Sequence, residues 1–220
     1  MSLISEEDKK FLKKEFEKKM KDDVYVYVFT SNDNCRYCKE TVDITNETAS
    51  LHDAIHVEVL NVNSDKAKEM GVDKAPTTII TDNNEYGSRI RYIGIPAGYE
   101  FSSLIEDIIS VSQRKVTFEE HVKEHLDEID EPIEIKVFVT PTCPYCPRAV
   151  RTAHKFAQYN KYIHGKMIEA IEFPDWADQY GVSAVPHIVI NDDVVFQGAL
   201  PEHDFVENVM EVYSKMKNKK

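Results

Sequence analysis

The sequence predicts an α/β fold that consists of two copies of one unit. The chain has 220 residues, which suits one large domain or two small ones at about 100–200 residues per domain. Its four cysteines form two Cys-x-x-Cys pairs, Cys35/Cys38 and Cys143/Cys146. The same order of helical, strand-like and turn-like segments surrounds both pairs. We therefore expect two units, residues 1–114 and 115–220.

The repeated elements follow one another in the same order in both halves. Each half begins with a helical pattern and a strand rich in β-branched residues, which leads into the cysteine pair. A second strand, a Gly-Val dipeptide with a proline five residues after the glycine, a third strand, a fourth strand that ends in glycine and a closing helix follow. The first half has these elements at residues 5–20, 24–30, 56–62, 71–80, 91–94 and 101–111. The second half has them at residues 117–129, 133–140, 166–173, 181–190, 195–198 and 205–216.

Further sequence features support the helix expected at 117–129 and describe the join before it. Thr117 and Glu120 have the spacing of a capping box at the start of the helix. Phe118 and three later apolar residues recur at helical spacing. The join near residues 112–116 is too short to be a free tether, so we expect the two units to pack together.

The charge balance excludes several classes of partner. The chain has 27 basic and 39 acidic residues and a net charge of −12. Nucleic-acid binding derives its affinity mainly from Lys and Arg that neutralise phosphates, and adsorption to anionic membranes needs the same charges. No uncharged apolar run approaches the ~18 residues of a membrane-spanning helix, and the N-terminus lacks the pattern of a secretion signal. We expect a cytoplasmic protein that binds neither nucleic acid nor membrane.

The cysteine spacing favours redox chemistry over metal binding. In a reducing cytosol Cys-x-x-Cys pairs are usually catalytic or metal-binding. Zinc ribbons separate their pairs by ~15–20 residues, whereas 104 residues lie between these pairs. His121 and His125 match a His-x-x-Glu-His zinc pattern, but on a short scaffold helix we interpret them as solvated or half-buried. We expect no metal and no bound cofactor, because the chain has neither a dinucleotide nor a phosphate-loop motif.

A strand, a Cys-x-x-Cys pair, a helix and a proline ahead of a strand resemble the thioredoxin and glutaredoxin fold. The Cys143-Pro144-Tyr145-Cys146 motif is similar to that of glutaredoxins, and two fused units resemble the protein disulfide oxidoreductases of archaea and thermophilic bacteria. The resemblance implies a central mixed sheet flanked by helices in each unit. It also implies cis peptide bonds before Pro76 and Pro186, facing the cysteines.

The residues around the second pair suit a reactive thiol. A thiol must ionise to attack a disulfide, and the unpaired N–H groups of a helix N-terminus favour the thiolate. Cys143 lies between a strand and a helical run that we expect from Arg148, with Pro144 at a first helical position. Cys146 would then lie on the inner side and resolve the mixed disulfide. We expect this pair to exchange faster than Cys35 and Cys38, because Arg36 favours a thiolate at Cys35 whereas Asp33 opposes it.

The prolines and tyrosines beside the cysteines are candidate substrate contacts. Proline at 76 or 186 leaves the backbone of Ala75 or Val185 free to pair with an extended substrate segment. Tyr37 and Tyr145 would add apolar contacts beside the sulfur. Such a surface suits flexible protein substrates.

Two departures from the related families affect the expected chemistry. The Gly-Gly-Asp of glutaredoxins is replaced by Gly94-Ile95-Pro96 in the first half and by Gly198-Ala199-Leu200-Pro201 in the second. This replacement argues against glutathione as the preferred partner. The buried Asp of thioredoxins is replaced by Phe29 and Val137. Glu58 and Glu169 are the candidates for accepting the proton of the second cysteine.

The sequence therefore predicts a thiol–disulfide oxidoreductase that reduces, oxidises or isomerises protein disulfides. Its partners would be protein substrates with disulfides or thiols and an electron donor similar to thioredoxin reductase. One alternative is a dithiol relay that passes electrons to a peroxidase. The other is a chaperone-like binding protein with inert cysteines.

Overall fold

Two compact units make up the chain. The computed structural model describes residues 2–192 and 194–218, of which 194 and 195 by their backbone alone. The first unit comprises the residues up to Pro96 and Leu104–Lys115, and the second comprises Ala97–Ser103 and the residues from Val116 on. Residues 97–103, which the sequence places in the first half, therefore belong to the second unit by their contacts.

The first unit has four strands in the order β2-β1-β3-β4. They are β1 (Val24–Thr30), β2 (Ile55–Asn61), β3 (Thr77–Thr81) and β4 (Ile90–Ile93). β1 pairs in parallel with β2 and antiparallel with β3, and β3 pairs antiparallel with β4. The register places Phe29 opposite Thr77, so the end of β1 lies beside the strand that follows Pro76.

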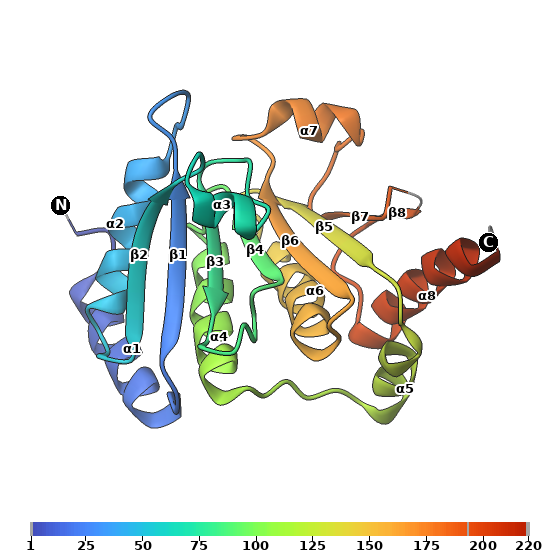
Figure 1. Cartoon of the computed structure of the whole chain (residues 1–220), viewed down its shortest axis with the longest axis horizontal. Helices are drawn as coiled ribbons and strands as arrows, with labels where there is room; N and C mark the ends of the chain where they lie inside the picture. Colours follow the sequence, from blue (N-terminus) through green and yellow to red (C-terminus); the bar gives the residue numbers. More distant parts are fainter. Residues whose placement is uncertain (1, 193, 219–220) are drawn as a thin grey trace. The chain divides into compact units, whose positions relative to one another are not determined.

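Helices cover both faces of this sheet. They are α1 (Glu6–Lys19), α2 (Cys38–Ala49), α3 (Asp65–Glu69) and the part of α4 (Glu100–Gln113) from Leu104 on. Figure 1 shows α1 and α2 behind the strands and α3 in front of them. The Glu47 carboxylate of α2 accepts hydrogen bonds from the N–H groups of Leu3 and Ile4, before α1. On the other face, Ala67 of α3 packs with Phe29 and Ile79 in a small buried cluster.

The second unit repeats this topology with the strand order β6-β5-β7-β8. Its strands are β5 (Ile133–Val139), β6 (Ile163–Glu169), β7 (His187–Ile190) and β8 (Val194–Gln197). β5 pairs in parallel with β6 and antiparallel with β7, and β7 pairs antiparallel with β8. The α/β class and the internal repeat that the sequence predicts are thus confirmed.

The helices of the second unit follow the same plan. They are α5 (Glu120–Glu128), α6 (Cys146–Tyr159), α7 (Pro174–Gln179) and α8 (Glu202–Asn218). The buried Phe156 of α6 meets Phe205 of α8 with ring centroids 5.6 Å apart. α6 lies along β5 and β6 (Figure 1). Its first residue, Cys146, is buried in the core of this unit.

Two predicted boundaries in the second unit are wrong. α5 begins at Glu120, and its N-cap is Glu119 with no capping side chain, so Thr117 forms no capping box. Phe118 instead stays in the extended segment, where its ring packs against Phe156 at 5.6 Å. β6 begins at Ile163, three residues before the predicted start of the strand.

Gly165 explains why the sequence pattern does not predict the first residues of β6. The residue lies inside the strand, where glycine weakens the apolar signal. A Cβ atom at this position would lie 2.8 Å from the carbonyl oxygen of Ala153 in α6. Glycine therefore allows the close approach of α6 to β6.

No helix in the described ranges is both long and apolar enough to cross a membrane.

Candidate active site

The second cysteine pair lies where β5 turns into α6. The Cys143 N–H donates to the Thr140 carbonyl oxygen at 3.1 Å, which closes the turn after the strand. α6 begins at Cys146 with Tyr145 as its N-cap, and Pro147 occupies its first turn. The prediction that the helix starts near Arg148 with Pro144 in a helical position is therefore wrong. Pro144 lies in the turn before the helix.

Cys143 is the accessible member of this pair. Its side chain is 8% exposed, whereas Cys146 is fully buried. The Cys143 thiol donates to the Val185 carbonyl oxygen, with sulfur and oxygen 3.7 Å apart. The Val185–Pro186 peptide bond is cis, as the resemblance implies, and Pro186 is buried. The backbone before this proline therefore lies within reach of the Cys143 sulfur.

Cys146 is held in its protonated form by burial. Loss of hydration raises the pKa of the Cys146 thiol, and its hydrogen bond and charge interaction with Cys143 raise it further. A backbone hydrogen bond from Thr140 acts in the opposite direction. Cys143 thus has the exposure that an attacking thiol needs, and Cys146 has the burial and raised pKa of a resolving thiol.

Glu100 is a buried carboxyl group that acts on Cys146. Its side chain is 1% exposed, and burial raises the pKa of Glu100 to about 7, although the Ser103 hydroxyl opposes this by donating to the carboxylate at 2.8 Å. Its charge in turn raises the pKa of Cys146. One carboxylate oxygen, Oε1, has no hydrogen-bond partner among the described residues. A carboxyl group with this pKa can accept or release a proton near neutral pH.

Gly98 explains how Glu100 reaches the cysteine loop. The Tyr99 N–H donates to the Pro141 carbonyl oxygen at 3.0 Å. Gly98 has a φ of +62°, and a Cβ atom at this position would lie 2.2 Å from the same carbonyl oxygen. Only glycine combines this conformation with this approach, so Gly98 ties the start of α4 to the loop before Cys143.

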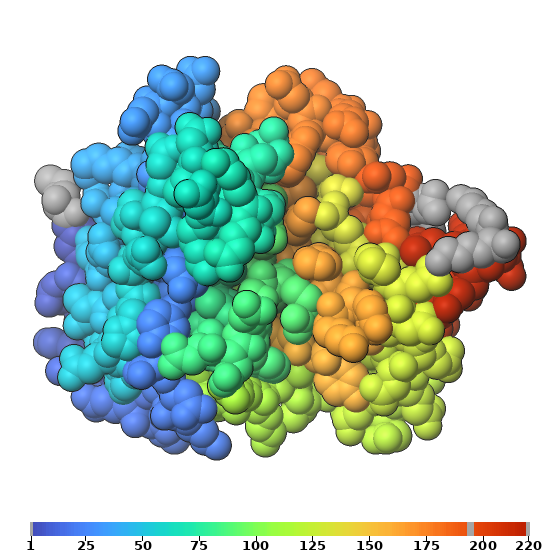
Figure 2. Space-filling model, in the orientation of Figure 1, coloured from blue at the N-terminus to red at the C-terminus, as the bar shows by residue number. Residues whose placement is uncertain are grey.

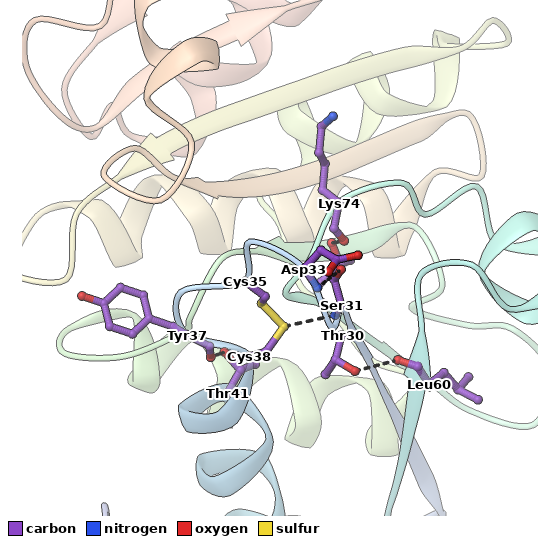
Figure 3. The surroundings of a disulfide bond; sticks show 10 residues. Thr30, Ser31, Asp33, Cys35, Tyr37, Cys38, Thr41, Leu60 and Lys74 are labelled. Carbon is purple, nitrogen blue, oxygen red and sulfur yellow. Dashed lines mark hydrogen bonds between the residues drawn. A yellow bond between two sulfur atoms is a disulfide. The ribbon is translucent and has the colours of Figure 1, made fainter.

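The first cysteine pair forms a disulfide at the start of α2. Cys35 and Cys38 have Cα atoms 5.5 Å apart. The Ser31 N–H donates to Cys38 Sγ at 3.4 Å, whereas Tyr37 points away from the sulfurs (Figure 3). The Ala75–Pro76 peptide bond is cis, as in the second unit. The loop of residues 31–37 projects from the surface of the first unit (Figure 2).

The charged residues beside the first pair have other contacts. The Arg36 guanidinium lies 5.1 Å from the centroid of the Tyr37 ring. Asp33 lies in the exposed part of the loop, and its N–H donates to the Ser31 hydroxyl at 3.1 Å.

The predicted substrate residues of the two units differ in their exposure. Pro76 and Pro186 are buried, and Ala75 and Val185 before them are half-buried. The two tyrosines occupy the N-cap positions of α2 and α6. Tyr145 is 70% exposed, whereas Tyr37 is half-buried.

The two predicted proton acceptors, Glu58 and Glu169, have different surroundings. Glu58 is exposed on β2. Glu169 is buried at the end of β6, where Oε2 of its carboxylate accepts the Glu172 N–H at 2.6 Å. The carboxyl group that acts on Cys146 is Glu100. Sequence reasoning missed it because it lies 43 residues before Cys143 at the start of a helix assigned to the other half; the preceding Gly98 was the one available signal.

Comparison with known proteins agrees with this geometry. A family model described as a thioredoxin domain matches residues 133–211. A thioredoxin of Methanocaldococcus jannaschii is 38% identical over 78 residues, which are 35% of this chain and 92% of that protein. The chain spans about a third of the length of longer curated relatives that it matches over 181 residues.

Solved structures match nearly the whole chain. A protein disulfide oxidoreductase from Aeropyrum pernix is 34% identical with a TM-score of 0.83, over 92% of this chain and 90% of that one. An alkylhydroperoxide reductase of Enterococcus faecalis shares the fold with a TM-score of 0.84 at 24% identity, over 93% of this chain and 98% of that one. With two units of one topology, a Cys-x-x-Cys pair at the start of a helix in each and a cis-proline directly before a strand in each, the chain belongs to the protein disulfide oxidoreductase family of thioredoxin-fold proteins.

Proposed function

We propose that this protein is a thiol–disulfide oxidoreductase that acts on protein disulfides through Cys143 and Cys146. The observation that carries the proposal is the unequal exposure of the two sulfurs beside the Val185–Pro186 bond. Cys143 is reachable from solvent and Cys146 is not. A substrate sulfur therefore meets Cys143 first.

The first step joins the substrate to Cys143. The Cys143 thiolate attacks one sulfur of the substrate disulfide, so a Cys143–substrate disulfide forms and the other substrate sulfur leaves as a thiolate. The Val185 backbone, whose carbonyl oxygen lies 3.7 Å from Cys143 Sγ, pairs with the extended substrate segment next to its cysteine. The exposed ring of Tyr145 offers an apolar contact on the same side of the loop.

The second step releases the substrate. The Cys146 thiol gives its proton to the Glu100 carboxylate, and the Cys146 thiolate attacks Cys143 Sγ. The mixed disulfide breaks, the second substrate sulfur leaves as a thiolate, and Cys143 and Cys146 become the disulfide. Two electrons have then moved from the protein dithiol to the substrate. Glu100 suits this role because burial raises its pKa to about 7.

The first pair takes part in the same chemistry, with Cys35 attacking and Cys38 resolving. It differs from the second pair in its charged neighbours and in its half-buried sulfurs. We expect the two pairs to have different reduction potentials, because a difference of about 30 mV needs only ~1.4 kcal/mol for a two-electron couple.

The proposed reaction needs a substrate and an electron donor. We propose that the substrates are cytoplasmic proteins with disulfides or accessible thiols, and that the oxidised enzyme is reduced by a protein donor similar to thioredoxin reductase. The division at residues 114 and 115 into two functional domains is part of the same proposal, with residues 97–103 serving the second domain because Glu100 acts on Cys146.

Reduction of insulin by dithiothreitol tests the activity. We expect the wild-type protein to accelerate precipitation of the insulin B chain, and Cys143→Ser to lose most of this acceleration. A variant with all four cysteines replaced by serine is the control for chaperone-like binding. If this variant alters precipitation as much as the wild type does, the protein acts by binding and the redox proposal fails.

A dithiol relay to a peroxidase is the second candidate. It is favoured by the fold shared with the alkylhydroperoxide reductase of Enterococcus faecalis. A relay would reduce a peroxiredoxin disulfide much faster than insulin. Comparable rates with both substrates favour a general oxidoreductase.

A further inference from the structure

A cluster of two histidines and a glutamate on the second unit lies outside the redox chemistry. His121 and His125 are four residues apart on α5 and therefore share one face of the helix. Glu207 projects from α8 toward the same point. His121 Nε2 lies 3.0 Å from Glu207 Oε1, and His125 Nε2 lies 3.7 Å from the same oxygen. We propose that these three residues bind a divalent transition-metal ion, with zinc as the reference ion.

The spacing of the ligand atoms suits one ion. One ligand atom from each residue lies within 4.8 Å of the others. Zinc binds imidazole nitrogen and carboxylate oxygen at about 2.0–2.2 Å, so tetrahedral ligands lie about 3.4 Å apart. The two distances to the glutamate oxygen bracket this value. Small side-chain rotations therefore close the site without moving either helix.

A hydrogen bond already orients one of the ligands. The His125 ring lies with Nδ1 2.8 Å from the His121 carbonyl oxygen. A carbonyl oxygen only accepts, so Nδ1 carries the hydrogen, and Nε2 is the ring nitrogen that faces Glu207. Backbone carbonyls commonly fix metal-binding histidines in this way.

The helices that carry the ligands are held together by other contacts. Val122 and Leu126 of α5 are buried in the core of the unit. The Tyr213 hydroxyl of α8 lies 2.8 Å from the Glu128 carbonyl oxygen at the end of α5. The ligands therefore project from a fixed pair of helices. An ion between them would tie α5 to α8 and stabilise the second unit.

The ligand types select the class of metal. Imidazole nitrogen suits zinc, nickel, copper and cobalt, whereas magnesium and calcium prefer oxygen ligands. His121 and Glu207 are exposed and His125 is half-buried, so water would complete the coordination. The surplus of acidic residues, which gives a net charge of −12, adds a general attraction for cations.

Calorimetric titration of the full chain with zinc tests the proposal. The protein is first oxidised so that both cysteine pairs are disulfides, because free thiolates also bind zinc. We expect one zinc ion per chain and a rise in Tm with zinc. His121→Gln, His125→Gln and Glu207→Gln should each weaken binding about tenfold or more. His203→Gln is the matched control, since His203 is an exposed histidine of α8 outside the cluster.

The outcome decides between two accounts. Loss of the zinc-dependent rise in Tm in the three ligand variants, with His203→Gln unchanged, supports the site. Equal zinc binding by the wild type and a His121→Gln/His125→Gln double variant overturns it, as does a wild type that binds no zinc. The test uses oxidised protein and measures no turnover, so its result is independent of the proposed redox function.

Discussion

At the scale of single residues, the second site depends on how burial divides two identical thiols. Cys143 is slightly exposed and donates to the Val185 carbonyl, and Cys146 is sealed in the core. Burial raises the pKa of the Cys146 thiol and also that of Glu100. When the Glu100 carboxyl group is ionised, it can therefore accept the proton of the Cys146 thiol.

Replacement of Glu100 tests its ionisation through stability. The ordinary pKa of 4.5 applies to the unfolded chain, and burial raises the pKa to about 7 in the folded protein. The folded state therefore binds the extra proton between these values. The stability associated with Glu100 is complete below pH 4.5 and is lost as the pH rises through 7, by roughly 3 kcal/mol. Glu100→Gln should lack this loss and be more stable than the wild type at pH 8.

Urea unfolding at pH 5 and pH 8 provides the measurement. Glu58→Gln, an exposed position on β2, is the control and should keep the pH dependence of the wild type. Equal pH dependence in the wild type and Glu100→Gln would show that Glu100 ionises at its ordinary pKa.

The sequence predicts some of these residues and not others. Cysteine spacing and the proline ahead of a strand are local patterns, so both cysteine pairs, Pro76 and Pro186 can be predicted. Glu100 lies 43 residues before Cys143 and comes to it through the Gly98 turn against Pro141. No periodicity in the sequence encodes that contact.

At the scale of helices and strands, most elements could be predicted because their apolar periodicity is strong. The predicted start of α5 is wrong because Phe118 packs on α6 from an extended segment, although its spacing in the sequence also suits a helix. The predicted start of β6 is wrong because Gly165, which lies close to the α6 backbone, weakens the apolar pattern of the strand. In both places a tertiary contact overrides the local signal.

Asn160 at the end of α6 should be important for the stability of the second unit. Its amide nitrogen donates to the carbonyl oxygens of Leu126 and Ile129 at 2.6 and 2.9 Å, and its side-chain oxygen accepts the Tyr162 N–H at 2.7 Å. Asn160→Ala removes these three hydrogen bonds, and of the three backbone groups the Leu126 carbonyl keeps another partner, the Ile129 N–H at 3.3 Å. We expect a loss of about 1–3 kcal/mol in the free energy of unfolding.

Thermal or urea unfolding measures this effect. Asn208→Ala is the matched control, because the Asn208 amide donates to the Asp204 carbonyl of its own helix. Its loss should cost less than about 0.5 kcal/mol. Equal losses in the two variants would show that the link between α5 and α6 adds nothing to stability.

At the scale of the whole molecule, one topology carries two cysteine pairs with different surroundings. The first pair forms a disulfide beside the Ser31 N–H, and the second is a dithiol under the influence of Glu100. The repeat of the fold was predictable from the order of its elements. The surroundings of the two pairs differ in side chains that the repeat does not share.

We expect the two pairs to titrate separately with a dithiothreitol redox buffer. Alkylation of free thiols at each potential, followed by mass spectrometry of the two cysteine peptides, should give two midpoints. Cys35→Ser/Cys38→Ser should keep the midpoint of the second pair, and Cys143→Ser/Cys146→Ser should keep that of the first. A single shared midpoint in the wild type would contradict the independence of the pairs.

The most direct test of the central claim is to trap a substrate on Cys143. Cys146→Ser, made in a Cys35→Ser/Cys38→Ser background, is mixed with a protein substrate that contains a disulfide, and the product is analysed by non-reducing mass spectrometry. The account predicts a covalent complex linked through Cys143, and no complex with Cys143→Ser in the same background. Full turnover by the Cys146→Ser variant without a trapped complex would contradict the assigned roles of the two cysteines.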